Sequence, residues 1–333
     1  MRGAVVTGIG SYVPDQVLTN RDLERIVETS DEWIVSHTGI RERRVAAPDQ
    51  AASDLGTAAA RRALADAGLT PDDLDLIICA TITGDMIVPA TACLIQANLG
   101  ASHCGAFDLA SGCTGWMYGL GLASGMIRSG ECDHVLVIAT EILTRVTNWT
   151  DRATCVLFGD AAGAAVVSAG ETGTGILAYE LVSVGEASDL LIIRAGGSRQ
   201  PLTHQGLDQR LNTLEMNGPE LFKLAVRGVP EVAERTVAKA GLRISDLKLV
   251  VMHQANQRIL DAVAKRLSLA EEQVISIVGQ YGNTSASSMP LALDVAYRQG
   301  RLEPGDDVLL VGFGSGFTLG AAVLRWTKPL PAS

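Results

Sequence analysis

A cysteine, a histidine and an asparagine each stand in a loop beside a predicted strand, and together they carry the groups needed for acyl transfer. Cys113 follows the predicted strand 105–108, His253 follows the apolar run 249–252, and Asn283 lies in a polar, glycine-containing loop. A thiolate can attack a thioester. Imidazole and carboxamide groups can donate hydrogen bonds to an oxygen on which negative charge develops. These three residues therefore form a candidate catalytic set.

Each of the three residues also has an ordinary structural explanation. Cysteines are often buried as small hydrophobic residues, histidines at strand ends are often hydrogen-bonded structural groups, and asparagine commonly fills turns and helix caps. Cys113 has an additional signal, because it stands at the start of a predicted helix whose dipole favours thiolate. Gly112 and Gly115 would let other groups approach it closely.

The glycine-rich segment 312–320, GFGSGFTLG, is a fourth candidate piece of the site. A dinucleotide-binding loop is one interpretation, but the helix and acidic residue that should follow such a loop are missing. The early Gly8-Ile-Gly10 lacks the third glycine of that motif. A tight glycine turn whose backbone N–H points into the site suits an oxyanion hole better.

The elements that must position these residues are repeated along the chain. Residues 60–79 and 233–252, which are 173 positions apart, both read as a helix closed by Ala-Gly-Leu, an Asp-Leu turn and an apolar strand. Gly68 and Gly241 stand where a helix C-cap needs a left-handed residue. The same shift aligns the strand 134–139 with 307–312, which indicates an internal duplication.

Each half reads as strands alternating with helices, which predicts an α/β protein with largely parallel sheets. We expect strands near residues 4–8, 74–80, 105–108, 134–139 and 161–167 of a first half, 1–173. We expect others near 175–184, 247–253, 307–313 and 319–325 of a second half, 174–333.

The reactive residues do not repeat with the scaffold. Ala80 takes the place of His253 in the first half, and Ala286 takes the place of Cys113 in the second. Since open parallel sheets bind ligands beyond the carboxyl ends of their strands, we expect the active site between the two halves.

Composition excludes several classes of protein. The 333 residues carry a formal charge of −10, which disfavours a general nucleic-acid binder. Hydrophobic residues make up 47% of the chain, which excludes disorder. The charge-free stretch 308–324 contains four glycines and predicts two buried strands rather than a membrane span. The six cysteines form no C-x-x-C pair, and no export signal is evident, so we expect a cytoplasmic protein without disulfides or zinc.

The chain resembles β-ketoacyl-acyl carrier protein synthase III, the initiating condensing enzyme of type II fatty acid synthesis. The likeness spans nearly the whole chain and includes residues 29–44, TSDEWIVSHTGIRERR, and 151–163, DRATCVLFGDAAG. It implies a homodimer with the thiolase-like fold, in which two duplicated βαβαβαββ halves form a five-layer αβαβα sandwich.

The resemblance also implies a role for individual residues. Cys113 would be the catalytic nucleophile, while His253 and Asn283 would bind the malonyl thioester. The N–H groups of Cys113 and Ser315 would form the oxyanion hole. The other implied contacts are Trp33, Arg152 and His37 for coenzyme A, Val88 for the acyl pocket, and Lys223, Arg258, Lys265 and Arg266 for acyl carrier protein.

Several of these positions depart from the family pattern or have a second explanation. His37 replaces a common arginine, and Val88 replaces a phenylalanine that some members supply across the dimer to close the acyl pocket. The smaller valine would leave room for longer or branched primers. Ser315 replaces a glycine, and Leu319 a tryptophan. The four basic residues are also explained as ordinary solvated helix charges.

The implied reaction is a decarboxylative Claisen condensation of an acyl-CoA primer with malonyl-acyl carrier protein, without a metal or redox cofactor. The alternatives are a secondary-metabolism relative that uses the same acyl-cysteine, a nicotinamide-dependent reductase, and a non-catalytic binding protein. A degradative thiolase would need a second cysteine near the C-terminus, but no cysteine follows Cys155. Elongating synthases use two histidines, whereas this chain has Asn283.

Overall fold

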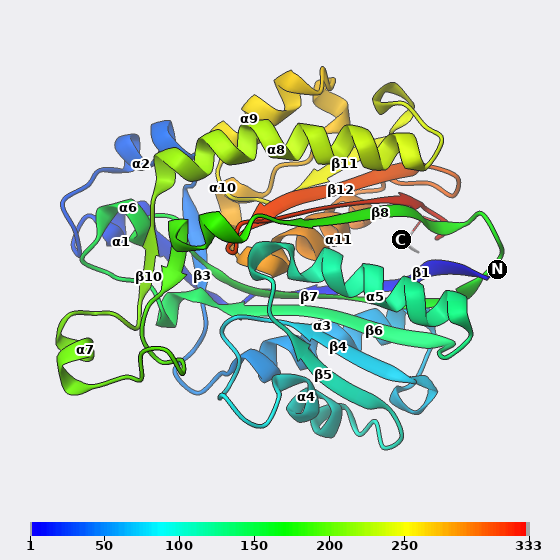
Figure 1. Ribbon diagram of the computed structural model, residues 1–333, viewed down its shortest axis with the longest axis horizontal. Helices are drawn as coiled ribbons and strands as arrows, with labels where there is room; N and C mark the ends of the chain where they lie inside the picture. Colours follow the sequence, from blue (N-terminus) through cyan, green and yellow to red (C-terminus); the bar gives the residue numbers. More distant parts are fainter. Residues whose placement is uncertain (1, 331–333) are drawn as a thin grey trace.

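The alternating strands and helices fold into five layers in the computed structural model, which describes residues 2–330 (Figure 1). Two sheets, each covered by helices on both faces, share a central helical layer. The predicted five-layer α/β fold is therefore confirmed, but the expectation of largely parallel sheets is wrong, because each sheet contains both parallel and antiparallel pairs. Among the described residues, no helix is long and apolar enough to cross a membrane.

The first sheet has the strand order β1-β7-β6-β4-β5. β4 pairs in parallel with β5 and β6, whereas β7 pairs antiparallel with β1 and β6. Its strands are β1 (Gly3–Tyr12), β4 (Leu76–Ala80), β5 (Gly105–Leu109), β6 (His134–Ile142) and β7 (Asp160–Gly170).

The second sheet repeats this order as β8-β13-β12-β11. Its strands are β8 (Gly175–Ser183), β11 (Leu249–Met252), β12 (Asp307–Gly314) and β13 (Thr318–Arg325). The expected equivalent of β5 is reduced to one isolated bridge between Val250 and Val274. A single pairing, Ala4 with Gly175, joins the two sheets. A turn between β7 and β8 contains the predicted boundary at residue 173, and the division into two domains stays a prediction.

Helices α5 (Gly115–Ser129) and α11 (Ser288–Arg298) form the central layer between the sheets. A helix that is buried on several sides must carry small or apolar side chains over most of its surface. Gly119 of α5 illustrates this, because a Cβ there would lie 2.7 Å from Val137. The outer layers consist of α3 (Ala52–Ala67) and α4 (Thr91–Leu99) on the first sheet and of α8 (Gly218–Lys239) and α9 (Gln257–Arg266) on the second.

The two predicted helix ends have the expected left-handed glycines. Gly68, with φ of +68°, closes α3. Gly241, with φ of +74°, follows directly on the last turn of α8. The structure therefore confirms these parts of the repeat.

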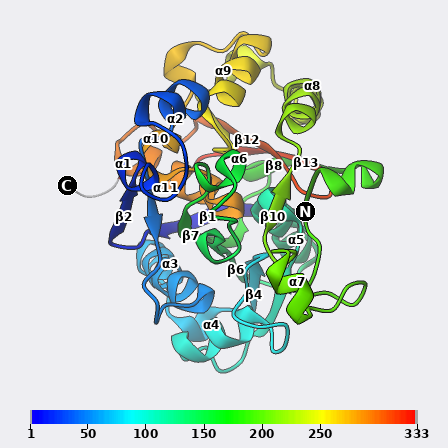
Figure 2. The ribbon, with the colours of Figure 1, turned by 90° about the vertical axis from the view of Figure 1, so that its left-hand side faces the viewer.

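Short elements gather at one end of the molecule, where they face the viewer in Figure 2. The sequence pattern did not predict them, because each is too short to show a periodicity. They are β2 (Gln16–Thr19), α1 (Asn20–Leu23), α2 (Asp31–Thr38), β3 (Glu42–Val45), α6 (Arg152–Cys155), β9 (Leu191–Ile193), α7 (His204–Asp208), β10 (Leu214–Met216) and α10 (Val278–Tyr281). Two 3₁₀ turns carry site residues, η2 (Gly112–Thr114) and η7 (Ser285–Ser287).

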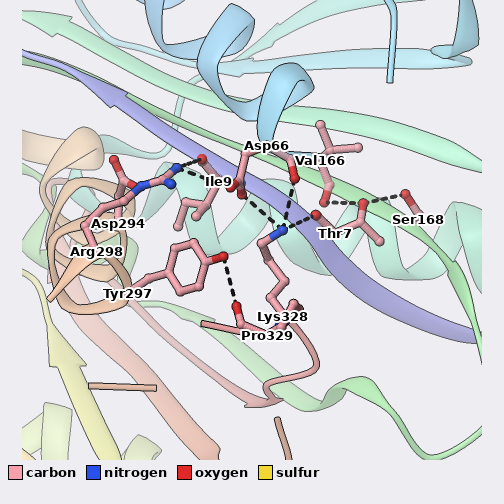
Figure 3. A network of polar contacts seen from close by, with 10 residues as sticks. All are labelled: Thr7, Ile9, Asp66, Val166, Ser168, Asp294, Tyr297, Arg298, Lys328 and Pro329. Carbon is pink, nitrogen blue, oxygen red and sulfur yellow. Dashed lines mark hydrogen bonds and ion pairs between the residues drawn. The ribbon is translucent and has the colours of Figure 1, made fainter. Parts of the chain in front are cut away.

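A polar network ties the C-terminal segment to both halves of the fold (Figure 3). The nearly buried ammonium of Lys328 donates to the Thr7 carbonyl oxygen at 2.6 Å and lies 3.1 Å from Asp66 Oδ2. Arg298 of α11 contacts the other oxygen of Asp66 at 3.3 Å and Asp294 at 3.1 Å. This network links β1, α3, α11 and the chain after β13.

Candidate active site

Cys113, His253 and Asn283 line one cavity of about 470 Å³. Cys113 lies in η2 just before α5, His253 follows β11, and Asn283 lies between α10 and η7. All three side chains are buried. The structure thus brings together the three residues that the sequence analysis selected, with Cys113 and His253 beyond the carboxyl ends of β5 and β11.

The His253 ring is neutral and fixed in orientation. Burial lowers the pKa of His253 to about 3. Its Nδ1 lies 2.8 Å from Ser288 Oγ, which also accepts the Gln254 N–H at 3.3 Å. A Ser288 hydroxyl that donates its own hydrogen to Nδ1 leaves the proton of the ring on Nε2. A neutral imidazole in this tautomer presents Nε2–H as a hydrogen-bond donor.

The Asn283 carboxamide is held through its oxygen. Oδ1 accepts the Ser285 N–H at 2.9 Å, so the NH₂ group is the part that can donate into the cavity. The loop reaches this position through Gly282, whose φ of +66° and ψ of −160° are accessible essentially only to glycine. A Cβ on Gly282 would also lie 2.6 Å from the Leu157 carbonyl oxygen.

Burial changes the pKa of the Cys113 thiol more strongly than the sequence indicated. Burial raises the pKa of Cys113 to about 12, and the hydrogen bond from the Ser285 hydroxyl only partly opposes this. The predicted helix start is present, but burial outweighs the effect of its dipole on the Cys113 thiol. Cys113 is a neutral thiol at pH 7, and its proton must leave during catalysis.

The two glycine turns at the site lie against each other. A Cβ on Gly314 would lie 2.6 Å from the Cys113 nitrogen, and a Cβ on Gly112 would lie 2.9 Å from the Ser315 nitrogen. The backbone amides of Cys113 and Ser315 are therefore close neighbours. Adjacent backbone N–H groups of this kind can stabilise an oxyanion.

Cys113 also lines a second cavity, of about 320 Å³. Its walls come largely from Ile82, Leu143, Phe158, Leu191, Ile192, Ile193 and Leu214. These apolar residues lie on short loops and on β9 and β10, so no sequence periodicity marked them. We call this mainly apolar cavity the inner cavity and the 470 Å³ cavity the outer cavity. The Cys113 thiol lies where the two meet.

Trp33, Arg152 and His37 form one cluster near the outer cavity. The Arg152 guanidinium carbon lies 4.5 Å from the Trp33 ring centre, and the His37 ring stacks on Trp33 at 4.4 Å. His37 also lines the outer cavity. A planar base inserted between Trp33 and Arg152 needs a separation of about 7 Å, twice the usual contact distance. The Arg152 side chain must therefore move before a base can enter.

Val88 lines neither of the two cavities that contain Cys113. It is 79% exposed, next to Ile87 at 90%, on the loop between β4 and α4. Its predicted contact with an acyl group requires a second copy of the chain and stays a prediction.

The four basic residues predicted to bind acyl carrier protein are exposed on α8 and α9. Lys223 and Arg258 lie at the outer cavity, whereas Lys265 and Arg266 lie at the end of α9. Lys223 pairs with Glu220 at 2.6 Å, and Arg258 lies 6.0 Å from the Phe222 ring centre. The patch therefore extends from the cavity mouth along α9.

Comparison with known proteins gives consistent matches along the chain. A family model described as 3-oxoacyl-[acyl-carrier-protein (ACP)] synthase III matches residues 107–185, and a model of the C-terminal part of that family matches residues 237–326. The β-ketoacyl-[acyl-carrier-protein] synthase III of Symbiobacterium thermophilum is 52% identical over 98% of this chain and 99% of that protein.

Solved structures agree with these sequence matches. The 3-oxoacyl-[acyl-carrier-protein] synthase III of Aquifex aeolicus is 44% identical, with a TM-score of 0.90 over 97% of this chain and all of that chain. The priming β-ketosynthase of the R1128 polyketide pathway is 36% identical, with a TM-score of 0.92 over 98% of this chain and 97% of that chain.

Proposed function

The chain belongs to the 3-oxoacyl-[acyl-carrier-protein] synthase III family, and we propose that it initiates fatty acid synthesis by condensing an acyl-CoA primer with malonyl-acyl carrier protein. One observation carries this proposal. The Cys113 thiol, the His253 imidazole and the Asn283 carboxamide meet at one cavity, and the thiol also lines the mainly apolar inner cavity.

The first half-reaction loads the primer onto Cys113. The acyl chain enters the inner cavity, and the Cys113 sulfur attacks the thioester carbonyl. The N–H groups of Cys113 and Ser315 stabilise the oxyanion, and coenzyme A leaves as the thiol. Trp33, His37 and Arg152 are proposed to hold the coenzyme A portion near the outer cavity.

The second half-reaction extends the acyl group by two carbons. The malonyl thioester carbonyl accepts hydrogen bonds from His253 Nε2–H and the Asn283 NH₂ group. Loss of CO₂ leaves enolate charge on that oxygen, where these donors stabilise it. The enolate carbon attacks acyl-Cys113 and releases 3-oxoacyl-acyl carrier protein. Both substrates are thioesters, and the proposed reaction needs no metal or redox cofactor.

The basic patch on α8 and α9 is proposed to bind the acidic acyl carrier protein at the mouth of the outer cavity. Lys223, Arg258, Lys265 and Arg266 supply its positive charge. Complementary charge favours encounter and orientation more than it adds affinity. This placement would direct the carrier's thioester arm towards Cys113.

A homodimer is the proposed assembly in the cytoplasm. Several apolar side chains are exposed on the β5 edge of the first sheet and on the loop between β4 and α4: Met86, Ile87, Val88 and Phe107. An exposed sheet edge with apolar residues is a common site of pairing between chains. In such a dimer, Val88 would reach the acyl cavity of the partner.

Intact-mass measurement after incubation with acetyl-, isobutyryl- and octanoyl-CoA tests the first half-reaction. We expect one acyl adduct per chain, absent in Cys113→Ala. Addition of malonyl-acyl carrier protein should then discharge the adduct with release of CO₂. An adduct that transfers to another acceptor without CO₂ release would favour the secondary-metabolism alternative, which the likeness to the polyketide priming enzyme supports. No adduct on Cys113 would overturn the proposal.

A further inference from the structure

Glu141 is a fully buried carboxyl group close to the nucleophile that the proposed reaction leaves without a role. It lies near the end of β6 and is 0% exposed. Its oxygens accept hydrogen bonds from the Ile82 N–H at 3.3 Å, the Thr83 hydroxyl at 2.5 Å and the Ser285 hydroxyl at 3.2 Å. All three donors are neutral groups. A buried carboxylate held only by neutral donors is costly, so its presence beside an active site indicates a function.

Ser285 connects this carboxyl group to Cys113. Its hydroxyl donates to Glu141 Oε1 at 3.2 Å, and the same hydroxyl lies near enough to Cys113 to lower the pKa of that thiol. Ser285 also lines the inner cavity beside Cys113. A hydroxyl carries a single hydrogen and cannot donate to both partners at once. The direction of its hydrogen bond must therefore change when the thiol loses its proton.

The backbone at Ser285 is held in an unusual conformation to achieve this placement. Its φ of +52° is in the left-handed region, which non-glycine residues seldom adopt. The Ser285 N–H meanwhile fixes the Asn283 oxygen at 2.9 Å. Strained residues that persist in this way cluster at active sites.

We propose that Ser285 and Glu141 form a proton relay that takes the Cys113 proton during acyl transfer. This inference rests on the proposed function, because it assigns the route of the proton in the first half-reaction. Glu141 is a proton acceptor acting through Ser285, and it does not touch the substrate.

The proposed transfer is balanced at each step. The Cys113 S–H gives its proton to Ser285 Oγ while the Ser285 O–H gives its proton to Glu141 Oε1. The sulfur then forms a bond to the acyl carbon, and the bond from that carbon to the coenzyme A sulfur breaks. The proton returns from Glu141 through Ser285 to the coenzyme A thiolate. The net products are acyl-Cys113 and coenzyme A thiol, with Glu141 ionised as before.

The charge at the site supports this route. Burial raises the pKa of Glu141 to about 7, far nearer to that of the Cys113 thiol than the value of about 3 for His253. Proton transfer to Glu141 moves one negative charge within the buried cluster from carboxylate to sulfur. Ionisation of Cys113 beside a charged Glu141 would instead create two negative charges in a low-dielectric site.

A purely structural role for Glu141 makes a different prediction. The carboxyl group also holds the Ile82–Thr83 segment and η7 against β6. If this were its only role, substitution would lower stability and leave the pH dependence of Cys113 reactivity unchanged. The pH profile therefore separates the two roles.

The test is the rate of Cys113 alkylation by iodoacetamide between pH 5.5 and 9.5, followed by peptide mass spectrometry on the full chain. In the unsubstituted protein we expect the rate to rise with a step near pH 7, where Glu141 ionises. Glu141→Gln should remove that step and slow alkylation at pH 7.5 by about 100-fold, the low end of general-base effects. Ser285→Ala should also remove the step and slow alkylation, although this variant keeps the Glu141 carboxyl group.

Asp160→Asn is the matched control. Asp160 is also fully buried and accepts only from the Ala46 N–H and from the Thr144 N–H and hydroxyl. We expect this variant to keep the step near pH 7. Thermal unfolding reports whether each variant is folded, and Ser285→Ala decides the question if Glu141→Gln does not fold. A normal step in folded Glu141→Gln or Ser285→Ala would overturn the relay.

The proposed function has its own readout. Alkylation needs no acyl substrate, so it reports the relay even if acyl-CoA does not label Cys113. Failure of acyl-CoA labelling with a normal alkylation profile would count against the proposed function alone. Normal labelling with an unchanged profile in both variants would count against the relay alone.

Discussion

Ser288 Oγ lies 2.8 Å from Nδ1 of His253, so a hydroxyl on the central helix α11 that donates to this atom leaves the ring proton of an imidazole at the end of β11 on Nε2. The contact joins residues 35 positions apart. It makes the neutral ring a donor through Nε2, which is the form required to stabilise an enolate oxygen. The role of His253 therefore depends on a residue that makes no contact with substrate in the proposed reaction.

Ser288→Ala should slow the condensation step without slowing primer loading. Loss of the hydroxyl removes the group that selects Nε2–H, and we expect the rate of 3-oxoacyl product formation to fall by about tenfold. Intact-mass labelling of Cys113 by acyl-CoA should continue at its normal rate. Ser287→Ala is the control, because the Ser287 hydroxyl donates only to the Thr284 carbonyl oxygen at 2.8 Å. An equal loss of both half-reactions would contradict the assignment.

Glu141 should make stability depend on pH in a predictable direction. Burial raises its pKa from 4.5 to about 7, so the folded protein holds this proton more tightly than the unfolded chain. The free energy of unfolding contributed by Glu141 is therefore highest below pH 4.5 and falls as the pH rises to about 7. Relative to that of the unsubstituted protein, the free energy of unfolding of Glu141→Gln should rise by up to about 3 kcal/mol between pH 4 and pH 8.

Urea unfolding at the two pH values measures this gain. The change with pH is the informative quantity, because the substitution also alters hydrogen bonds at both pH values. Asp160→Asn gives the comparison for a second buried carboxyl group, whose pKa burial also raises. A Glu141→Gln variant whose relative stability is the same at pH 4 and pH 8 would contradict the buried, neutral-donor environment described for Glu141.

Lys328→Met should lower the free energy of unfolding substantially, although Lys328 lies near the C-terminus. It leaves Asp66 and the Thr7 carbonyl oxygen without their nearly buried cationic partner. Removal of one member of a buried ion pair costs about 3 kcal/mol or more. Lys223→Met, which breaks an exposed pair with Glu220, should cost less than about 1 kcal/mol. Equal effects of the two substitutions in urea unfolding would show that the network contributes little.

Trp33→Ala should weaken use of acyl-CoA without changing the chemistry at Cys113. The Trp33 ring packs against both Arg152 and His37, so its loss removes the surface on which a base can stack. Loss of one aromatic ring that stacks on a base costs about 1–3 kcal/mol of binding free energy. We therefore expect a KM for acyl-CoA at least fivefold higher with a similar kcat. A large fall in kcat at unchanged KM would place Trp33 in another role.

Ile193→Phe should shorten the primer range. Ile193 lines only the inner cavity and pairs with Leu214 across β9 and β10. The larger ring would fill part of the 320 Å³ inner cavity. We expect labelling by octanoyl-CoA to fall at least tenfold relative to labelling by acetyl-CoA, which serves as the internal control. Equal effects on both primers would show that the acyl chain does not enter this cavity.

The regular elements of the fold were predictable because their signals are local. Apolar runs bounded by turn residues indicated the strands of both sheets, and Ala-Gly-Leu endings indicated the C-termini of α3 and α8. The 173-residue repeat then predicted sheets of the same design. It did not predict that the second sheet replaces its fifth strand by the single Val250–Val274 bridge, since pairing at a sheet edge depends on the path of the loop outside it.

The candidate catalytic set was predictable for a different reason. Cys113 and His253 each follow a strand whose end could be located in one of the two duplicated halves, and Asn283 was selected from a polar, glycine-containing loop. The sequence by itself therefore determined which thiol, imidazole and carboxamide meet.

Only the tertiary structure decided the protonation and surroundings of these groups. Glu141 and Ser285 are 144 residues apart, and although Ser285 lies two residues after Asn283, nothing in the sequence pairs it with Glu141. The Cys113 thiol is neutral because packed atoms exclude water from it, which the dipole of its helix could not indicate. Burial, and the partner that each buried polar group finds, depend on how distant elements pack together, and so they become defined only when the chain has folded.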